Sequence, residues 1–196
     1  MKLHTNPDEF HELISIVAQE KNISESAVER DYYIVMMLKA LSESAYSDQC
    51  VFKGGTSLSK CYPNSIERFS EDIDLTFLGM ELSDNACDKA IKAIEKVMTA
   101  GANTEKIDSE RSNRSKSMYV RFAAPEDRIK LEIGSTVHRL PERRDINDDP
   151  ALPYSRAGFS LRRLERFILP LYSTFGFYSS VYPVWSYPTD SCQAAA

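Results

Sequence analysis

The spacing of apolar residues predicts two helices at the start of the chain. Thr5 or Asn6 can cap a first helix, because Pro7 and acidic residues follow and apolar side chains then recur every three or four positions up to Ala18. A second helix is expected from Ser24 to about Leu41, with an apolar stripe broad enough to lie deep in a core. The N-terminal region is therefore predicted to be helical.

Beyond these helices, short apolar runs predict a sheet. Residues 50–52 form a strand that ends at a glycine pair, and a short helix is expected over 57–62. Apolar and polar residues alternate over 72–77, which is typical of a strand with one polar face. A helix capped by Ser83 or Asp84 and ending near Gly101 would cover the sheet.

The second half of the chain gives weaker patterns. Residues 118–123 and 129–133 predict a hairpin, whereas 104–116 are polar and give no assignment. Residues 139–156 indicate a loop, and from Leu161 onward the aromatic-rich sequence has neither helical nor strand periodicity. We therefore expect one domain over residues 1–150 and an irregular, aberrant or truncated tail over 151–196.

Composition narrows the class of protein. The 196 residues are 42% hydrophobic and 27% charged, as in ordinary globular proteins. A net charge of -5 argues against a surface built for indiscriminate nucleic-acid binding. The four cysteines form no Cys-x-x-Cys pair, so neither a zinc site nor a disulfide framework is indicated. The polar start and the lack of a long apolar run predict a cytoplasmic protein without a membrane span.

Two motifs carry candidate chemistry. Lys53, Gly54, Gly55, Thr56 and Ser57 stand where a strand gives way to a helix, so their backbone N–H groups could approach a phosphate chain. A plain tight turn is the alternative for a glycine pair.

The second motif is a pair of aspartates. Asp72 and Asp74 are two apart in a strand, so both carboxylates face one side, with the Cα atoms about 6–7 Å apart. They would repel each other unless a divalent cation, most naturally Mg²⁺, lay between them. The alternative is a solvated strand face. We expect the two motifs on neighbouring strands, where they could converge on one metal-bound triphosphate.

The sequence resembles a known family at these motifs. Residues 53–60 and 68–75 resemble the first motif of the AbiEii-type nucleotidyltransferase toxins, and residues 29–32 resemble that family's N-terminal segment. The likeness covers about residues 24–143. It implies an α/β fold with a polymerase β-like nucleotidyltransferase core, in which a short mixed sheet has N-terminal helices packed on it.

The resemblance also implies roles for individual residues. Gly55 and Thr56 would contact phosphate, Asp72 and Asp74 would bind Mg²⁺, and Glu132 would be a third catalytic carboxylate. An ordinary salt-bridged strand residue is the alternative for Glu132. Phosphate contacts are also predicted for Arg68, as for Lys53, with a solvated surface role as the alternative.

Three functions follow from these observations. The first is Mg²⁺-dependent transfer of a nucleotide from a nucleoside triphosphate to an acceptor such as tRNA, by the toxin of a toxin-antitoxin or phage-defence pair. Because the family usually continues into a helical C-terminal part that this chain does not resemble after Pro150, the second is an inactive remnant that binds nucleotide or antitoxin only. The third is a calcium or structural metal site in an interaction module.

Overall fold

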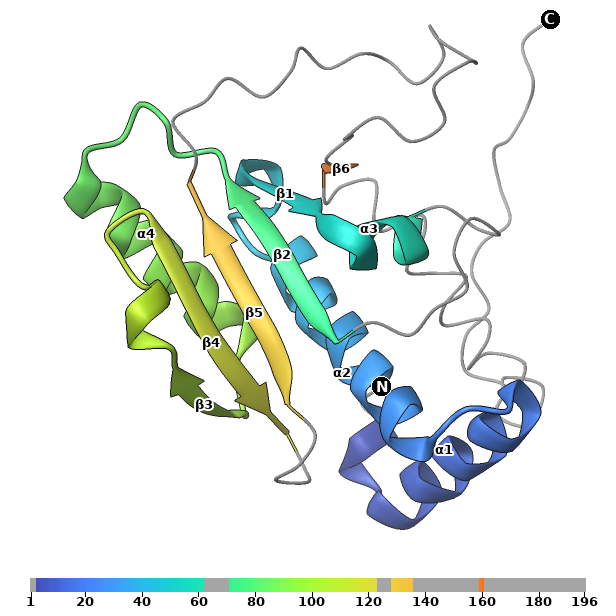
Figure 1. Ribbon diagram of the computed structural model, residues 1–196. Helices are drawn as coiled ribbons and strands as arrows, with labels where there is room; N and C mark the ends of the chain where they lie inside the picture. The colour runs from blue at the N-terminus through green and yellow to red at the C-terminus, as the bar shows by residue number, and fades with distance from the viewer. Residues whose placement is uncertain (1–2, 62–70, 123–127, 136–158, 161–196) are drawn as a thin grey trace, which may run out of the picture.

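The computed structural model describes residues 3–61, 71–122, 128–135 and 159–160, which form a mixed α/β fold (Figure 1). The helices are η1 (Leu3–Thr5), α1 (Pro7–Lys21), α2 (Glu25–Ser42), η2 (Ser47–Gln49), α3 (Gly54–Cys61), α4 (Asp84–Met98) and η3 (Asp108–Glu110). The strands are β1 (Cys50–Lys53), β2 (Asp72–Phe77), β3 (Asn103–Lys106), β4 (Ser115–Arg121), β5 (Ile129–Gly134) and β6 (Phe159–Ser160).

The predicted helix starts are confirmed by their caps. Ser24 and Ser83 precede α2 and α4, and each side-chain oxygen accepts a hydrogen bond from a backbone N–H in the first turn. Asn6 is the N-cap of α1, although its side chain makes no capping hydrogen bond. The short helix after the glycine pair differs from its prediction, because α3 begins at Gly54 rather than at Ser57. The glycines therefore form the first turn of a helix instead of a separate tight turn.

The sheet is mixed, with strand order β3-β4-β5-β2-β1-β6. The predicted hairpin is confirmed as the antiparallel pair β4–β5, and β1 lies antiparallel to β2. The strand β2 runs parallel to β5. The polar stretch 104–116, which gave no assignment, contains most of β3 and the start of β4. The predicted fold class is thus confirmed, with a mixed sheet and helices packed on it.

One short strand comes from the segment predicted as an irregular tail. In β6, Phe159 and Ser160 pair with Phe52 and Val51 of β1. These two residues of 151–196 therefore belong to the sheet rather than to an irregular tail. The remainder of that segment lies outside the described residues, as do the whole of the loop predicted over 139–156 and the boundary predicted at residue 150.

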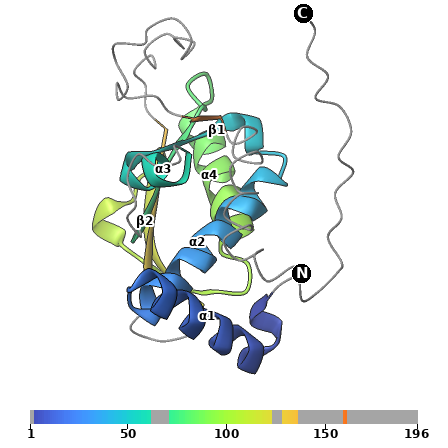
Figure 2. The same ribbon diagram turned by 90° about the vertical axis from the view of Figure 1, so that its right-hand side faces the viewer.

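The core lies between the sheet and the helices on one of its faces. The helices α2 and α4 lie side by side on that face, and α1 packs against α2 (Figures 1 and 2). Ile73 and Leu75 of β2 and Leu131 of β5 point into this layer and are at most 1% exposed. Because side chains alternate along a strand, the polar residues between them point to the opposite face. Within the described residues, no helix is both long and apolar enough to cross a lipid bilayer.

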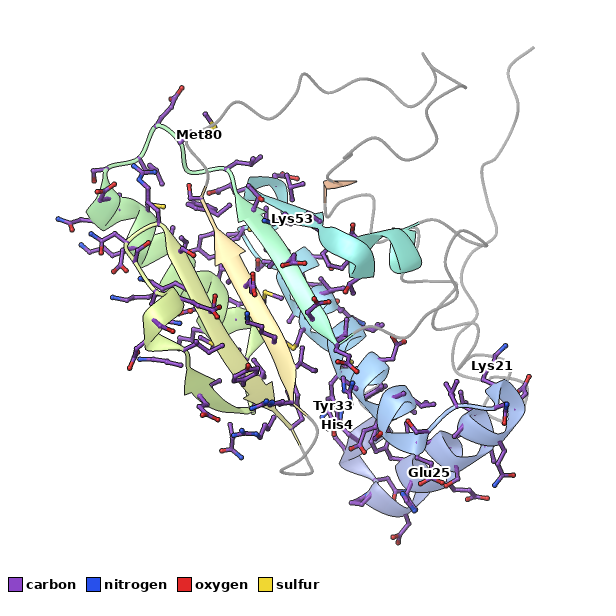
Figure 3. All side chains as sticks on the ribbon, in the orientation of Figure 1. His4, Lys21, Glu25, Tyr33, Lys53 and Met80 are labelled. Atoms are coloured by element: carbon purple, nitrogen blue, oxygen red, sulfur yellow. The ribbon has the colours of Figure 1, made fainter. Side chains whose placement is uncertain are left out.

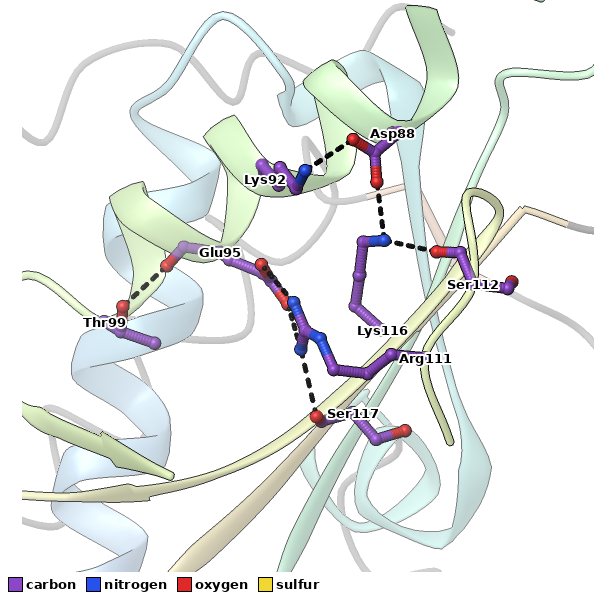
Figure 4. A network of polar contacts seen from close by, with 8 residues as sticks. All are labelled: Asp88, Lys92, Glu95, Thr99, Arg111, Ser112, Lys116 and Ser117. Carbon is purple, nitrogen blue, oxygen red and sulfur yellow. Dashed lines mark hydrogen bonds and ion pairs between the residues drawn. The ribbon is translucent and has the colours of Figure 1, made fainter. Parts of the chain in front are cut away.

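Two ion pairs attach α4 to β4 and to the segment that leads into it (Figure 4). The ammonium of Lys116 lies 2.6 Å from Asp88 of α4, and Arg111 lies 2.9 Å from Glu95 of the same helix. Arg111 also donates to the backbone carbonyl of Ser117 at 3.0 Å. Lys116, Arg111 and Glu95 each have side chains no more than 12% exposed, so these charges pair inside the packed layer. The segment 107–111 is therefore fixed both to β4 and to α4.

Candidate functional site

The strand β2 brings Asp72 and Asp74 to the same face of the sheet. Both side chains are half-buried, while Ile73 and Leu75 between and after them are fully buried on the helix side. The strand is paired on both sides, with β1 and with β5. The predicted common direction of the two carboxylates is therefore present in the structure.

Thr56 joins the glycine segment to Asp72. Its side chain is completely buried, and its hydroxyl lies 2.6 Å from the backbone carbonyl of Asp72 and 2.9 Å from the carboxylate oxygen Oδ1. Ser57 is also buried, and its hydroxyl donates to the carbonyl of Gly54 at 2.8 Å. Both hydroxyls are thus directed into the protein. A phosphate contact from this segment would come from backbone N–H groups, since the first turn of a helix leaves them without intrahelical partners.

Gly54 lies directly against Asp74. Its φ angle is +79°, in the left-handed region that L-residues with a side chain rarely adopt. A Cβ atom at this position would collide with the carboxylate oxygen Oδ2 of Asp74. Two independent constraints therefore favour glycine here. The second constraint shows that the start of α3 and the Asp74 carboxylate share one small volume.

Lys53 adds a positive charge to the same place. It is the last residue of β1, it pairs in register with Asp74, and its side chain is exposed at the junction with α3 (Figure 3). The sequence prediction placed Lys53 with the glycine segment as a phosphate contact. The structure brings this lysine, Gly54 and Asp74 together at the end of two adjacent strands.

The electrostatics of Asp74 reflect this crowding. The pKa of Asp74 is raised, first by partial burial and then by the negative charges of Asp72 and Glu132. The positive charges of Lys53 and Lys130 oppose the rise. Ionisation of Asp74 is therefore less favourable than in an isolated aspartate, and a cation between the carboxylates would make it favourable again.

Glu132 lies beside Asp74 but has another partner. Parallel pairing of β2 with β5 places Glu132 in register with Asp74 on the same face. Its carboxylate contacts the ammonium of Lys130 at 2.5 Å, and Lys130 also lies 3.0 Å from Glu110 of η3. The salt-bridged alternative for Glu132 is therefore present in this structure. The catalytic role of Glu132 stays a prediction.

The donor atoms at Asp72 and Asp74 suit magnesium. Mg²⁺ prefers oxygen ligands and is usually held by one or two carboxylates, with water and substrate phosphate completing its shell. Among the described residues, no three His, Cys, Asp or Glu side chains are gathered closely enough to hold a metal ion. Two carboxylates beside the start of α3 fit such a shared site, whereas an all-protein cage of the kind calcium favours does not.

Sequence reasoning gave no role in this region to Lys130 or to Glu110. Lys130 carries a usable signal, because it stands two positions before Glu132 in a predicted strand and must share its face. Glu110 lies in the polar stretch 104–116 and offers no comparable signal. Arg68, predicted to contact phosphate, lies outside the described residues.

Comparison with protein families gives one match. A family model described as "Nucleotidyl transferase AbiEii toxin, Type IV TA system" matches residues 37–170, which is more than half of the 196-residue chain. The match begins within α2, includes both motifs of the site and extends past residue 150. A search of curated proteins found no matching sequence.

Three similar solved structures share 20–23% sequence identity with this chain. MenT4, a nucleotidyltransferase toxin from Mycobacterium tuberculosis H37Rv, is 23% identical with a TM-score of 0.46, covering 63% of this chain and 44% of that one. A putative nucleotidyltransferase from Helicobacter pylori is 20% identical with a TM-score of 0.40, covering 61% and 49%. JHP933 from the same organism is 20% identical with a TM-score of 0.42, covering 61% and 48%. The chain spans less than half the length of each of these structures.

Proposed function

Because the chain belongs to the AbiEii nucleotidyl transferase toxin family of type IV toxin-antitoxin systems, we propose that it transfers a nucleotide from a nucleoside triphosphate to an acceptor hydroxyl. Asp72 and Asp74 hold Mg²⁺ in this proposal, and the start of α3 binds the phosphate chain. The observation that carries the proposal is the convergence of Thr56 on Asp72 and of Gly54 on Asp74. These contacts tie the glycine segment and the paired carboxylates to one place.

Each residue of the site has a distinct part in the reaction. Bound Mg²⁺ supplies positive charge that offsets the charge developing on the leaving pyrophosphate. Thr56 fixes the position of Asp72 through two short contacts, and Lys53 orients the triphosphate as a point charge. Glu132, in register with Asp74, accepts the proton of the attacking hydroxyl. The protein thus contributes mainly positioning and a fixed field.

The proposal extends to the wider setting of the reaction. We propose that the protein is the toxin of a pair with a cognate antitoxin, acting in the cytoplasm and in phage defence. The acceptor in this proposal is an RNA such as tRNA, which presents a terminal hydroxyl. The net charge of -5 favours recognition of that acceptor through a local surface rather than through overall charge.

Incubation with labelled nucleoside triphosphates, Mg²⁺ and total tRNA tests the proposal. We expect label to appear in the RNA with wild-type protein and to be lost in Asp72→Asn combined with Asp74→Asn. Glu12→Gln combined with Glu20→Gln is the matched control, because it removes the same charge from exposed positions of α1. Transfer that persists in the aspartate variant would refute the assigned site.

Calorimetry separates the enzyme from the binding-only alternative. Titration of the protein with a nucleoside triphosphate and Mg²⁺ should show binding that requires both aspartates. Binding of this kind without transfer to any RNA would favour a protein that holds nucleotide or antitoxin but does not catalyse transfer. The absence of both binding and transfer would contradict both functions.

A further inference from the structure

The side chain of Lys130 lies between two carboxylates that belong to different parts of the fold. Glu132 of β5 and Glu110 of η3 accept from the same ammonium, at 2.5 Å and 3.0 Å. Glu132 neighbours Asp74, whereas Glu110 lies in η3, which precedes β4 in the chain. Lys130 therefore has two available partners, and one of them belongs to the candidate site.

Glu110 is held firmly enough to act as the second partner. The N–H of Ile107 donates to the carbonyl of Ser117 at 3.1 Å, and Arg111 donates to the same carbonyl. Arg111 is also fixed by its buried ion pair with Glu95 of α4 (Figure 4). Lys130, and after it the side chain of Ser117, lowers the pKa of Glu110. The turn that carries Glu110 thus has contacts on both sides.

We propose that Lys130 and Glu110 together set the affinity of the carboxylate site for divalent cations. In the protein without a cation, Lys130 contacts both Glu132 and Glu110. When a cation binds at Asp72 and Asp74, Lys130 keeps its contact with Glu110 and releases Glu132, which can then face the cation. This inference rests on the proposed function, because it concerns the same metal site.

Competition between like charges is the physical basis of this exchange. A lysine ammonium and a divalent cation both stabilise the ionised form of Glu132, and they repel each other when they share it. If Lys130 had no other partner, cation binding would leave its charge unpaired beside another positive charge. Glu110 removes that penalty, because Lys130 can keep one ion pair with a small movement of its flexible side chain.

Two substitutions should change divalent-cation affinity in opposite directions. Lys130→Met removes the competitor, so we expect Mg²⁺ binding by calorimetry and Mn²⁺ binding by electron paramagnetic resonance to become about threefold tighter. Glu110→Gln leaves Lys130 with Glu132 alone, so we expect binding about threefold weaker. Lys130→Arg keeps the charge and should bind close to the wild-type value. The cation is the only ligand in these titrations.

A second ion pair on the same face supplies matched controls. Arg121 of β4 contacts Glu105 of β3 at 2.7 Å, and neither lies on β2 or β5. Arg121→Met and Glu105→Gln make the same charge changes farther from the aspartates, where solvent screens them. Each should leave cation affinity nearly unchanged, and shifts equal to those at Lys130 and Glu110 would reduce the effect to overall charge and overturn the inference.

The outcomes also separate this inference from the proposed function. If wild-type protein binds no divalent cation, or if binding survives loss of both Asp72 and Asp74, the metal site itself is wrong and the inference falls with it. If binding depends on those aspartates but Lys130→Met and Glu110→Gln do not shift it in opposite directions, only the role of Lys130 and Glu110 is overturned. Thermal unfolding of each variant verifies that the fold is retained.

Discussion

Replacing Gly54 by alanine tests the closest contact in the site. The backbone at this position has φ +79°, and the new Cβ would collide with Oδ2 of Asp74. Holding an alanine in the left-handed region costs about 1–2 kcal/mol of folding free energy. The collision adds a second effect, because the carboxylate of Asp74 must move away from the start of α3.

A second glycine separates these two effects. Gly101, just after α4, has φ +84°, but a Cβ there would meet no atom within 4 Å. Gly101→Ala therefore carries the backbone strain without the collision. We expect it to lower the free energy of unfolding by about 1–2 kcal/mol and to leave Mg²⁺ affinity unchanged. Gly54→Ala should be destabilised at least as much.

The difference between the two variants should appear in cation binding. Displacing a carboxylate from its position beside a metal typically weakens binding about 10–100-fold, so Gly54→Ala should lose at least about tenfold in Mg²⁺ affinity. Urea denaturation measures the stability of each variant, and calorimetry measures Mg²⁺ binding. If Gly54→Ala binds Mg²⁺ as well as Gly101→Ala does, Asp74 is not held against α3 in the way the structure indicates.

Further substitutions test the contact of Thr56 with Asp72 and the ion pairs that join α4 to β4. Thr56→Val should destabilise the fold by about 1–2 kcal/mol and weaken Mg²⁺ binding by loosening Asp72, with recovery in Thr56→Ser measured by the same two assays. Hydrogen bonds from lysine side chains lower the pKa of Asp88 from 3.8 to about 2, so the stability that ionised Asp88 contributes is present above pH 3.8 and is lost as the pH falls toward 2. The free energies of unfolding of wild type and Asp88→Asn, measured by urea denaturation, should therefore converge near pH 2. Arg111→Met should cost about 3–5 kcal/mol in urea denaturation by leaving Glu95 buried and unpaired, and adding Glu95→Leu should restore most of it.

Local patterns in the sequence predicted most of the elements around the site. The strict alternation over 72–77 fixed both the existence of β2 and the common face of Asp72 and Asp74. The candidate caps, Ser24 for α2 and Ser83 or Asp84 for α4, located the starts of both helices to within about one residue. These predictions succeeded because the same residues that determine local structure also determine burial.

The elements and contacts that the sequence did not predict depend on interactions between distant residues. All four residues of β3 are exposed, so the strand has no apolar period and exists only because β4 offers an edge to pair with. Lys116 is buried within β4 although lysine is rarely found in a core, and its partners, Asp88 on α4 and the carbonyl of Ser112, explain this. The ion pair between Lys130 and Glu110 likewise cannot be predicted from the sequence, since Glu110 lies in a turn without periodicity.

Because β2 is paired on both sides, a ligand bound to its side chains would stabilise the whole fold. A strand with neighbours on each flank, and with Ile73 and Leu75 buried beneath it, does not fray before the sheet itself comes apart. Ligand bound by Asp72 and Asp74 would therefore raise the melting temperature of the whole fold. Hydrogen exchange at the amides of Ile73 and Leu75 should slow in proportion to that rise.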